Sequence, residues 1–133
     1  MTITSSLIRI DWLEGFSYLA TPYSDSDALV RERRFLVVNA VAAKLMAAGC
    51  MLISPISHTH PIAIAGDLPC GWDFWGKYDR QLLECCDRVL VVTQAGWQNS
   101  VGLAGELSIA KELGLPVEYL DPKLWMTNET DDQ

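Results

Sequence analysis

The segment RVLVV at residues 88–92 is an apolar, strand-forming run after its first residue. A strand with one face in water alternates apolar and polar side chains, whereas a continuous apolar run must be covered on both faces. The segment CMLIS at residues 50–54 has the same buried character. Strands of this kind belong to parallel sheets with helices on both sides, so the two runs predict an α/β fold.

Helical patterns separate the strand-like segments along the chain. Gly49 and Gly114 follow the first and last of these patterns, where glycine commonly ends a helix. Right-handed crossovers between the strands then give a three-layer α/β/α sandwich with a small parallel, Rossmann-like sheet. We predict strands at 16–20, 50–54, 88–92 and 117–120, and helices at 26–48, 72–86 and 102–113.

One domain is expected for the 133 residues, with its core at 16–120 and a polar, frayed tail at 121–133. Residues 55–71 hold three prolines and two glycines, which predicts a long functional loop. Ligands bind beyond the carboxyl ends of parallel strands. The segments expected there are 21–25, 55–71 and 93–101, and the first contains the candidate substrate-binding residues Thr21, Pro22 and Tyr23.

The charge balance limits the class of ligand. The net charge is −7, from ten basic and seventeen acidic residues, and the densest basic cluster is RERR at 31–34. This balance argues against binding a long nucleic acid, but a single nucleotide needs only a few donors and a helix N-terminus. No apolar run is long enough to span a membrane and no secretory signal precedes the domain, so a cytoplasmic location is expected.

The cysteines do not form a familiar metal motif. None of the four belongs to a CxxC pair, and we interpret them as reduced, small apolar side chains. The alternative is a zinc site, although its spacing matches no common pattern. That site would use His58, His60 and Cys70.

Two carboxylates lie in the apolar stripes of their helices. At about 100° per residue, Glu106 falls between Ala110 and Leu113 on the helical circumference. Asp79 repeats the pattern in the helix of residues 72–86. A lone buried carboxylate is costly unless it is paired, hydrogen-bonded or protonated. The apolar neighbours of Asp79 one helical turn away are Trp75, Leu82 and Leu83.

A pair of acids converging on a cleft is suited to cleaving a bond at a sugar carbon. One acid attacks or steadies an oxocarbenium-like centre while the other manages protons. Glu106 lies about one turn into its helix, where the helix dipole favours the ionised form that a nucleophile needs. The alternative is structural: each carboxylate caps a loop or pairs with a buried arginine.

The loop before Glu106 contains the segment NSVG. Asn99, Ser100 and the amide groups near Gly102 form a candidate cradle for an anion or a sugar hydroxyl, although Ser100 is equally suited to cap the helix. Arg31 and Arg34 lie at the start of the first helix. They are candidates to neutralise a phosphate or to pair with an acid, and the alternative is a solvated charge cluster.

Aromatic residues and histidines complete the candidate site. Tyr18 lies in a buried strand, so its hydroxyl needs a partner, and a carboxylate is a suitable one; a plain core tyrosine is the alternative. His58 and His60 are candidates to contact ligand from the 55–71 loop, or are surface histidines. Trp72 and Trp75 are core residues or walls that stack on a base.

The chain resembles the nucleoside 2-deoxyribosyltransferase-like superfamily, which includes nucleoside deoxyribosyltransferases and 2′-deoxynucleoside 5′-monophosphate N-glycosidases. The resemblance covers about residues 16–120, and is closest to a bacterial branch of uncharacterised function that shares the segments SPISHxHPI and WDFW. The motifs that carry it are YLATPYS, the WxxxD that ends at Asp79, CDRVLVV and SVGLAGELSIAKELGLPV.

The resemblance implies a role for each matching residue. It implies that Glu106 attacks the anomeric carbon, that Asp79 lies near the sugar or base, and that Tyr18 orients the glutamate. Ser100 stands where the transferases carry an aspartate and the monophosphate hydrolases carry a phosphate-binding serine. A serine can donate to a phosphate that an aspartate would repel, which favours a nucleotide substrate and hydrolysis. The loop ATPYS and the longer 55–71 segment depart from the hydrolase pattern and would change the recognition of base and phosphate.

The expected function is therefore N-glycosidase activity on a (deoxy)nucleoside 5′-monophosphate through a glycosyl–Glu106 intermediate, with no metal or cofactor. The alternatives are deoxyribosyl transfer, hydrolysis of another N-glycoside such as a dinucleotide, and nucleotide binding without turnover. A structural domain would instead match Asp79 and Glu106 with buried arginines and have no cleft. The resemblance also implies a homodimer or larger homo-oligomer with a site completed by a neighbouring subunit.

Overall fold

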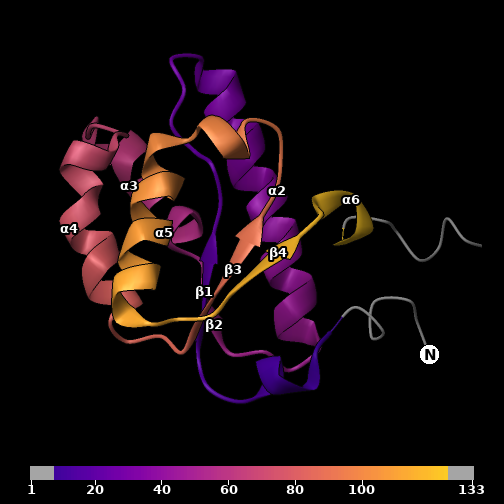
Figure 1. Cartoon of the computed structure of the whole chain (residues 1–133). Coiled ribbons are helices and arrows are strands. Elements are labelled where there is room, and N and C mark those ends of the chain that lie inside the picture. The colour runs from indigo at the N-terminus through magenta and orange to yellow at the C-terminus, as the bar shows by residue number, and fades with distance from the viewer. Residues whose placement is uncertain (1–7, 126–133) are drawn as a thin grey trace, which may run out of the picture.

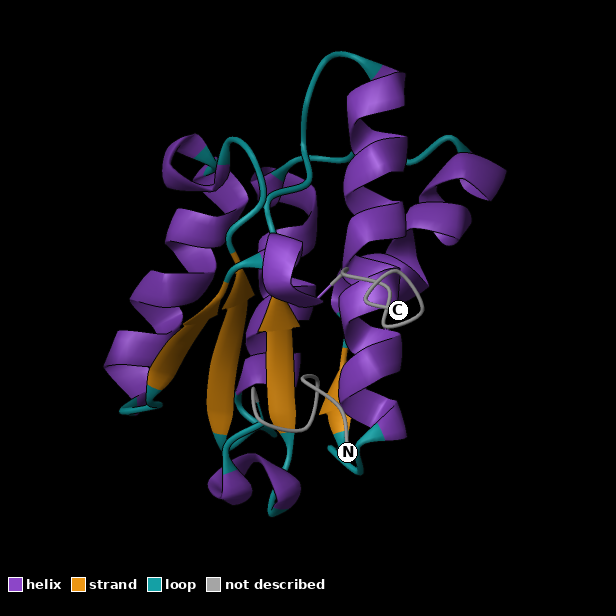
Figure 2. Cartoon of the chain, turned by 90° about the vertical axis from the view of Figure 1, so that its right-hand side faces the viewer, coloured by secondary structure: helices purple, strands orange, loops and turns teal. Residues whose placement is uncertain are grey.

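The computed structural model describes residues 8–125 and has the predicted three-layer α/β/α architecture (Figure 1). Four parallel strands form one sheet in the order β2-β1-β3-β4. The arrows in Figure 2 all point in the same direction. The strands are β1 (Ser17–Ala20), β2 (Leu52–Ile53), β3 (Arg88–Val92) and β4 (Val117–Leu120).

Helices cover both faces of this sheet. Figure 1 shows α4 and α5 on one side and α2 with α6 on the other. Asp27 caps α2 because its side chain accepts a hydrogen bond from the Leu29 amide at 2.9 Å. Gly114 ends α5 in the left-handed conformation that glycine adopts readily. The helices are α2 (Ala28–Ala47), α3 (Pro55–Gly66), α4 (Trp72–Leu83), α5 (Val101–Leu113) and α6 (Pro122–Trp125), with 3-10 turns η1 (Ile10–Leu13) and η2 (Trp97–Asn99).

Alternation along β1 divides the core into two clusters, because successive side chains of a strand point to opposite faces. Leu19 packs towards α2 and α6, whereas Tyr18 and Ala20 pack towards α4 and α5. Tyr18 is therefore directed at the helix pair that carries Asp79 and Glu106. The first cluster also contains Val38, Val41, Leu45, Leu90, Val92 and Leu120, and the second contains Leu83, Val89, Val91, Leu103, Ile109 and Ala110.

The predicted loop at 55–71 is wrong, because Pro55–Gly66 form helix α3. Pro55 occupies the first turn, where a proline has no hydrogen bond to lose. Pro61 lies inside the helix and removes one internal hydrogen bond, but α3 buries a face that offsets this loss. The buried residues of that face are Pro55, Thr59, His60 and Ala63. Only residues 67–71 remain a connection before α4.

The predicted frayed tail at 121–133 is wrong in its first part. Residues 122–125 form α6, and Trp125 is buried with its ring centroid 6.4 Å from that of Trp12. Residues 126–133 lie outside the described part of the chain. Among the helices of residues 8–125, none combines the length and apolar character needed to cross a membrane.

Candidate functional site

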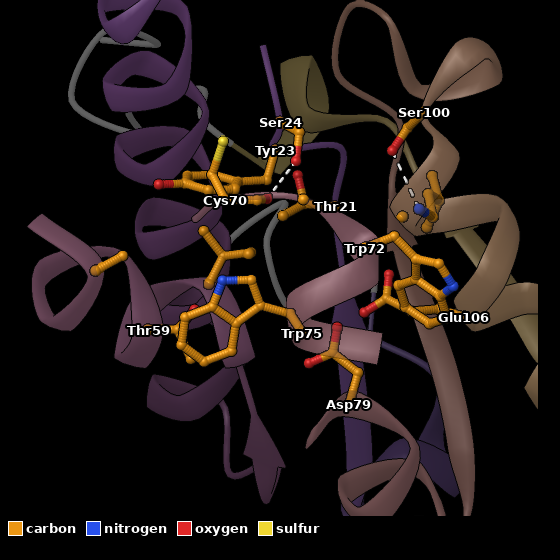
Figure 3. Close-up of a pocket in the computed structure, with 15 residues that line it drawn as sticks. Thr21, Tyr23, Ser24, Thr59, Cys70, Trp72, Trp75, Asp79, Ser100 and Glu106 are labelled. Atoms are coloured by element: carbon orange, nitrogen blue, oxygen red, sulfur yellow. Dashed lines mark hydrogen bonds between the residues drawn. The ribbon is translucent and has the colours of Figure 1, made fainter. Parts of the chain in front are cut away.

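A cleft lies beyond the carboxyl ends of β1 and β3. In the sheet, β2 lies on one side of β1, whereas β3 and β4 lie on the other. The strand order therefore reverses between β1 and β3, which is where ligands bind in sheets of this type. Its empty volume is about 520 Å³, with solvent at its mouth included. The lining residues are Thr21, Tyr23, Ser24, Ile56, Thr59, Ala63, Cys70, Gly71, Trp72, Trp75, Asp79, Ser100, Gly102, Leu103 and Glu106 (Figure 3).

Asp79 and Glu106 both line this cleft. Asp79 comes from α4 and Glu106 from α5, and their relative exposures are only 8% and 7%. The structure thus brings together the two carboxylates that we identified in the apolar stripes of their helices. Figure 3 shows the two carboxyl groups converging on the same part of the cleft.

Tyr18 contacts the acid pair from the strand behind it. Its hydroxyl donates a hydrogen bond to Glu106 Oε2, and its side chain is fully buried. Tyr18 is absent from the cleft lining, so it acts on Glu106 and has no surface of its own for ligand. The expected Tyr18–carboxylate contact is present.

Burial perturbs the acid pair strongly. Burial raises the pKa of Asp79 to about 6, and the hydrogen-bonding groups of Glu106 and Tyr18 oppose this rise. Burial, followed by the charge of Asp79, raises the pKa of Glu106 well above its usual range. Burial likewise raises the pKa of Tyr18, so its hydroxyl keeps its proton and remains a donor. The pair therefore holds a shared proton at neutral pH.

The expectation that the helix dipole keeps Glu106 ionised is wrong for the unliganded cleft. A helix dipole stabilises a nearby charge by about 0.3–1 kcal/mol, or by up to roughly 2 kcal/mol in partly buried geometries. Desolvation of the buried Glu106 carboxyl and the neighbouring Asp79 charge outweigh this contribution.

The structural alternative for the two acids does not fit. No arginine within residues 8–125 forms an ion pair with Asp79 or Glu106. The cleft that this alternative excludes is present, and both carboxylates line it.

Ser100 caps α5 and also lies in the cleft lining, so the placement is compatible with both functions expected for it. Its Oγ accepts the Leu103 amide at 3.1 Å and caps α5, and the side chain also lines the cleft. A hydroxyl that accepts through a lone pair still has a hydrogen to donate. Gly102 lies beside it in the cleft wall, in the first turn of α5, where helix amides lack internal partners. Ser100 and Gly102 therefore form a suitable cradle for an anion.

Three predicted binding residues lie outside the cleft lining. Pro22 is fully buried, and Asn99 is exposed at the end of η2. His58 is exposed on α3 and lines a separate, open groove with Tyr78. Because α3 is a helix, His58 and His60 point in different directions, and the predicted loop over the cleft does not exist. In the described residues, no group of His, Cys, Asp and Glu side chains could hold a metal, so the zinc alternative is not supported.

Arg34 also lies outside the cleft lining, and it links two loops. Its guanidinium donates to the carbonyls of Tyr23, Ser24 and Ala95 at 3.2, 3.0 and 3.1 Å. The prediction that Arg34 binds substrate is not supported by this placement. Its long side chain crosses from α2 to the loops after β1 and β3, and thereby fixes one rim of the cleft.

The predicted residues Thr21, Tyr23 and Trp75 do line the cleft. Trp75 Nε1 donates to the Pro69 carbonyl at 2.7 Å, which fixes the indole against the connection between α3 and α4. Thr21 Oγ1 accepts from the buried Gln94 side chain at 2.6 Å. Gln94 was not predicted from the sequence, since a glutamine after a strand carries no distinguishing signal.

A second group missed by the sequence analysis is the hydrogen-bonded chain of Tyr23, His60 and Glu32. The histidine was considered only as a loop residue, because the prolines concealed α3. No pattern in the sequence pairs Glu32 with His60, since the two lie on different helices.

Comparison with known proteins gives one family assignment. No curated protein matches this chain. The family defined by a domain of unknown function, DUF1937, matches residues 15–122, which span the four strands and every residue of the cleft lining. The chain therefore belongs to the DUF1937 family.

Proposed function

We propose that this protein is an N-glycosidase of the nucleoside 2-deoxyribosyltransferase-like type. It would hydrolyse the base–sugar bond of a (deoxy)nucleoside 5′-monophosphate. The observation that carries the proposal is the buried Tyr18–Glu106–Asp79 constellation, whose two carboxyl groups face one cleft. Perturbed acids in a cleft are typical of catalytic groups.

Because the two carboxyl groups hold one proton between them, one of the groups is neutral while the other is ionised. In the proposed reactive form, Glu106 is the carboxylate, supported by the Tyr18 hydrogen bond and the start of α5. Asp79 is the neutral acid in this form. Burial and the Asp79 charge favour the proton on Glu106 in the resting pair, so the reactive form requires the shared proton to pass from Glu106 to Asp79 when substrate binds. Two neighbouring acids of this kind divide the functions of nucleophile and proton donor between them.

In the first step a Glu106 oxygen forms a bond to C1′ of the sugar. The C1′–N bond breaks, and its electron pair leaves with the base. The proton of Asp79 passes to the departing base, directly or through a water molecule. Ser100 and Gly102 would hold the 5′-phosphate at the start of α5.

In the second step water attacks C1′ and displaces the Glu106 carboxylate. Asp79, now ionised, accepts the proton of the water and returns to its starting form. The products are the free base and a (deoxy)ribose 5-phosphate. This chemistry uses no metal or cofactor.

Release of free base from a panel of deoxyribo- and ribonucleoside monophosphates tests the proposal. We expect Glu106→Gln to lower kcat by about a thousandfold or more, because it removes the nucleophile. Glu112→Gln is the matched control, since Glu112 is an exposed acid of the same helix that pairs with Arg80. Full activity of the Glu106→Gln protein would exclude the mechanism.

The same assay separates the alternatives. A second base added to the reaction would accept the sugar if the protein is a transferase. Thermal stabilisation by nucleotides without release of base would indicate a binding module.

A homo-oligomer in the cytoplasm is also part of this proposal. The cysteines of the described residues are all free thiols, as a reducing compartment requires. Sedimentation equilibrium would measure the oligomeric state directly, and a monomer at assay concentrations would contradict this part.

A further inference from the structure

Three side chains from different segments form a hydrogen-bonded chain beside the cleft. Tyr23 Oη lies 2.5 Å from His60 Nδ1, and His60 Nε2 lies 2.8 Å from Glu32 Oε1. Tyr23 follows β1, His60 belongs to α3 and Glu32 to α2. The loop after β1 and the helices α2 and α3 must therefore all be in place for the chain of contacts to form.

The chain is held firmly at its centre. The relative exposure of His60 is 4%, and its ring lies 4.3 Å from that of Phe35 and edge-on to that of Tyr23 at 5.4 Å. The Glu32 side chain is about half exposed, at 49%. The contacts thus lead from a cleft residue through a buried ring to a carboxylate in solvent.

Hydrogen-bond chemistry fixes the direction of these bonds. An ionised Glu32 carboxylate can only accept, so His60 Nε2 carries a hydrogen and donates it. In a neutral imidazole the other nitrogen, Nδ1, is then an acceptor. With His60 neutral, the Tyr23 hydroxyl gives its hydrogen to Nδ1, and its oxygen then offers other groups only lone pairs.

Other groups near Tyr23 maintain this arrangement. Burial raises the pKa of Tyr23, as do the Cys70 thiol and Glu32, while the Arg31 guanidinium opposes the rise. The hydroxyl consequently stays protonated at neutral pH and continues to donate to His60. A tyrosine oxygen has two lone pairs, so one is left even if Arg31 uses the other.

Tyr23 lies at one end of the cleft and the acid pair at the other. Figure 3 shows the Tyr23 hydroxyl directed away from Glu106, on the side of Thr59 and Cys70, with Trp75 between the two ends. If Glu106 attacks the sugar and Ser100 holds the phosphate, the base extends towards Trp75 and Tyr23. This placement rests on the proposed function.

We infer that Tyr23, oriented by His60 and Glu32, is a specificity-determining residue that accepts a hydrogen bond from the base. A base carrying an amino group at its far edge can donate to Tyr23. The corresponding oxo base presents a second acceptor to an oxygen that has no hydrogen to give. The preferred substrates are therefore nucleotides with amino-bearing bases.

Binding to the Glu106→Gln protein tests this inference, because the nucleotides remain intact during the measurement. The probes are matched pairs that exchange an amino for an oxo group: dCMP against dUMP, and dAMP against dIMP. Isothermal titration calorimetry is expected to show roughly 3- to 10-fold tighter binding of the amino member, the ratio typical of one hydrogen bond.

Further substitutions in this background change the ratio in different ways. Tyr23→Phe removes the acceptor and is expected to bring the amino-to-oxo ratio to within about twofold of unity. His60→Phe keeps a ring beside Phe35 but frees the Tyr23 hydrogen, so it is expected to improve binding of the oxo member. Tyr119→Phe, which changes an exposed tyrosine of β4, is the control and should keep the ratio of the parent protein.

The outcomes separate this inference from the proposed function. An amino preference that Tyr23→Phe abolishes supports the inference even if the wild-type protein releases no base. Equal binding of both members, or a preference that survives Tyr23→Phe, overturns it even if base is released. Failure of all four nucleotides to bind would overturn the inference and the proposed function together.

Discussion

Ser100 is the residue at which the proposed phosphate contact can be tested with the least disturbance to the fold. It caps α5 and lines the cleft, and aspartate is an equally good N-cap. Ser100→Asp should therefore preserve the helix but place a negative charge where a 5′-phosphate is proposed to bind. We expect KM for nucleoside monophosphates to rise at least about tenfold, as one unfavourable charge contact requires. KM for the unphosphorylated nucleosides should change little, and an equal rise for both substrate types would contradict the phosphate assignment.

The buried acids should also leave a signature in stability. The pKa of Asp79 is raised from 3.8 to about 6 and that of Glu106 is raised well above its usual range, so the folded state holds protons that the unfolded chain releases. The two acids contribute favourably to the free energy of unfolding. This contribution is complete below about pH 4 and is lost as the pH rises through 6 and above.

Comparison with the Asp79→Asn/Glu106→Gln protein isolates this effect. From pH 4 to pH 7, the unfolding free energy of the wild-type protein should fall relative to that of the double variant. The expected fall is at least about 2 kcal/mol, since one pKa unit corresponds to about 1.4 kcal/mol and both acids contribute. Urea denaturation at several pH values measures it, and parallel pH profiles for the two proteins would show that the acids are not perturbed.

Single residues also show what the sequence could predict. Asp79 and Glu106 were identifiable because a carboxylate in an apolar stripe conflicts with helix amphipathicity. Arg34 and His58 were misplaced for another reason. Arginine and histidine are residue types that often bind ligands. Whether these two side chains reach the cleft depends on the direction of their helices and on the length of the side chain, and local sequence does not determine the direction of a helix.

At the scale of elements, the close contact of α4 and α5 depends on two glycines. The Trp72 indole lies between them: a Cβ added at Gly105 would lie 2.5 Å from the indole, and one at Gly76 would lie 2.9 Å from it. Trp72 lines the cleft beside the acids. The small residues therefore allow a large side chain to form the cleft wall without separating the helices.

Gly105→Ala tests this packing. Alanine normally stabilises a helix by about 1 kcal/mol relative to glycine, but here the clash should reverse the sign and cost about 1–3 kcal/mol. Thermal unfolding with near-ultraviolet circular dichroism measures both the stability and the environment of the indole.

A smaller side chain at position 72 provides the control for this substitution. In a Trp72→Leu background, Gly105→Ala should be neutral or stabilising, because the clashing ring is gone. An unchanged cost in that background would show that the indole is not the cause. Ser108→Ala, on an exposed position of the same helix, reports the effect of alanine alone.

The elements themselves were predictable where one pattern dominated. The apolar run of β3 and the glycine after α5 define their elements almost to the residue. Helix α3 was missed because proline counts against a helix in local sequence, whereas Pro55 lies in its tolerant first turn and the buried face offsets Pro61. With α3 missed, the Tyr23–His60 contact could not be anticipated.

At the scale of the whole molecule, the cleft joins segments that lie far apart in the sequence. The loop after β1, α3, α4 and the start of α5 all contribute to its lining. A ligand that fills it should therefore protect segments that are distant in the sequence, whereas α6 lies on the opposite face and should be unaffected (Figure 1).

Hydrogen exchange of the Glu106→Gln protein tests this arrangement. We expect dCMP near saturation, at about 100 times its Kd, to slow amide exchange in residues 21–25 and in the first turn of α5, and to stabilise the fold by about 2.7 kcal/mol. Deoxycytidine, which lacks the phosphate, should protect residues 21–25 but have a weaker effect on α5. Equal protection of α5 by both ligands would place the phosphate elsewhere.

The alternation of side chains along strand β1 restricts the mutations that this protein can accept during evolution. Tyr18 supports the acid pair on one face, and the adjacent Leu19 supports the hydrophobic core on the other. A single-residue insertion or deletion here would exchange the two faces, placing a phenol in the core and an aliphatic chain behind Glu106. Mutations of that kind would remove the Tyr18–Glu106 contact and the Leu19 core packing in one event, so variation in β1 is confined to substitutions that keep the alternation. A substitution in the loop after it, such as at Tyr23, leaves this alternation intact, so the proposed substrate preference could change without exchanging the two faces of β1.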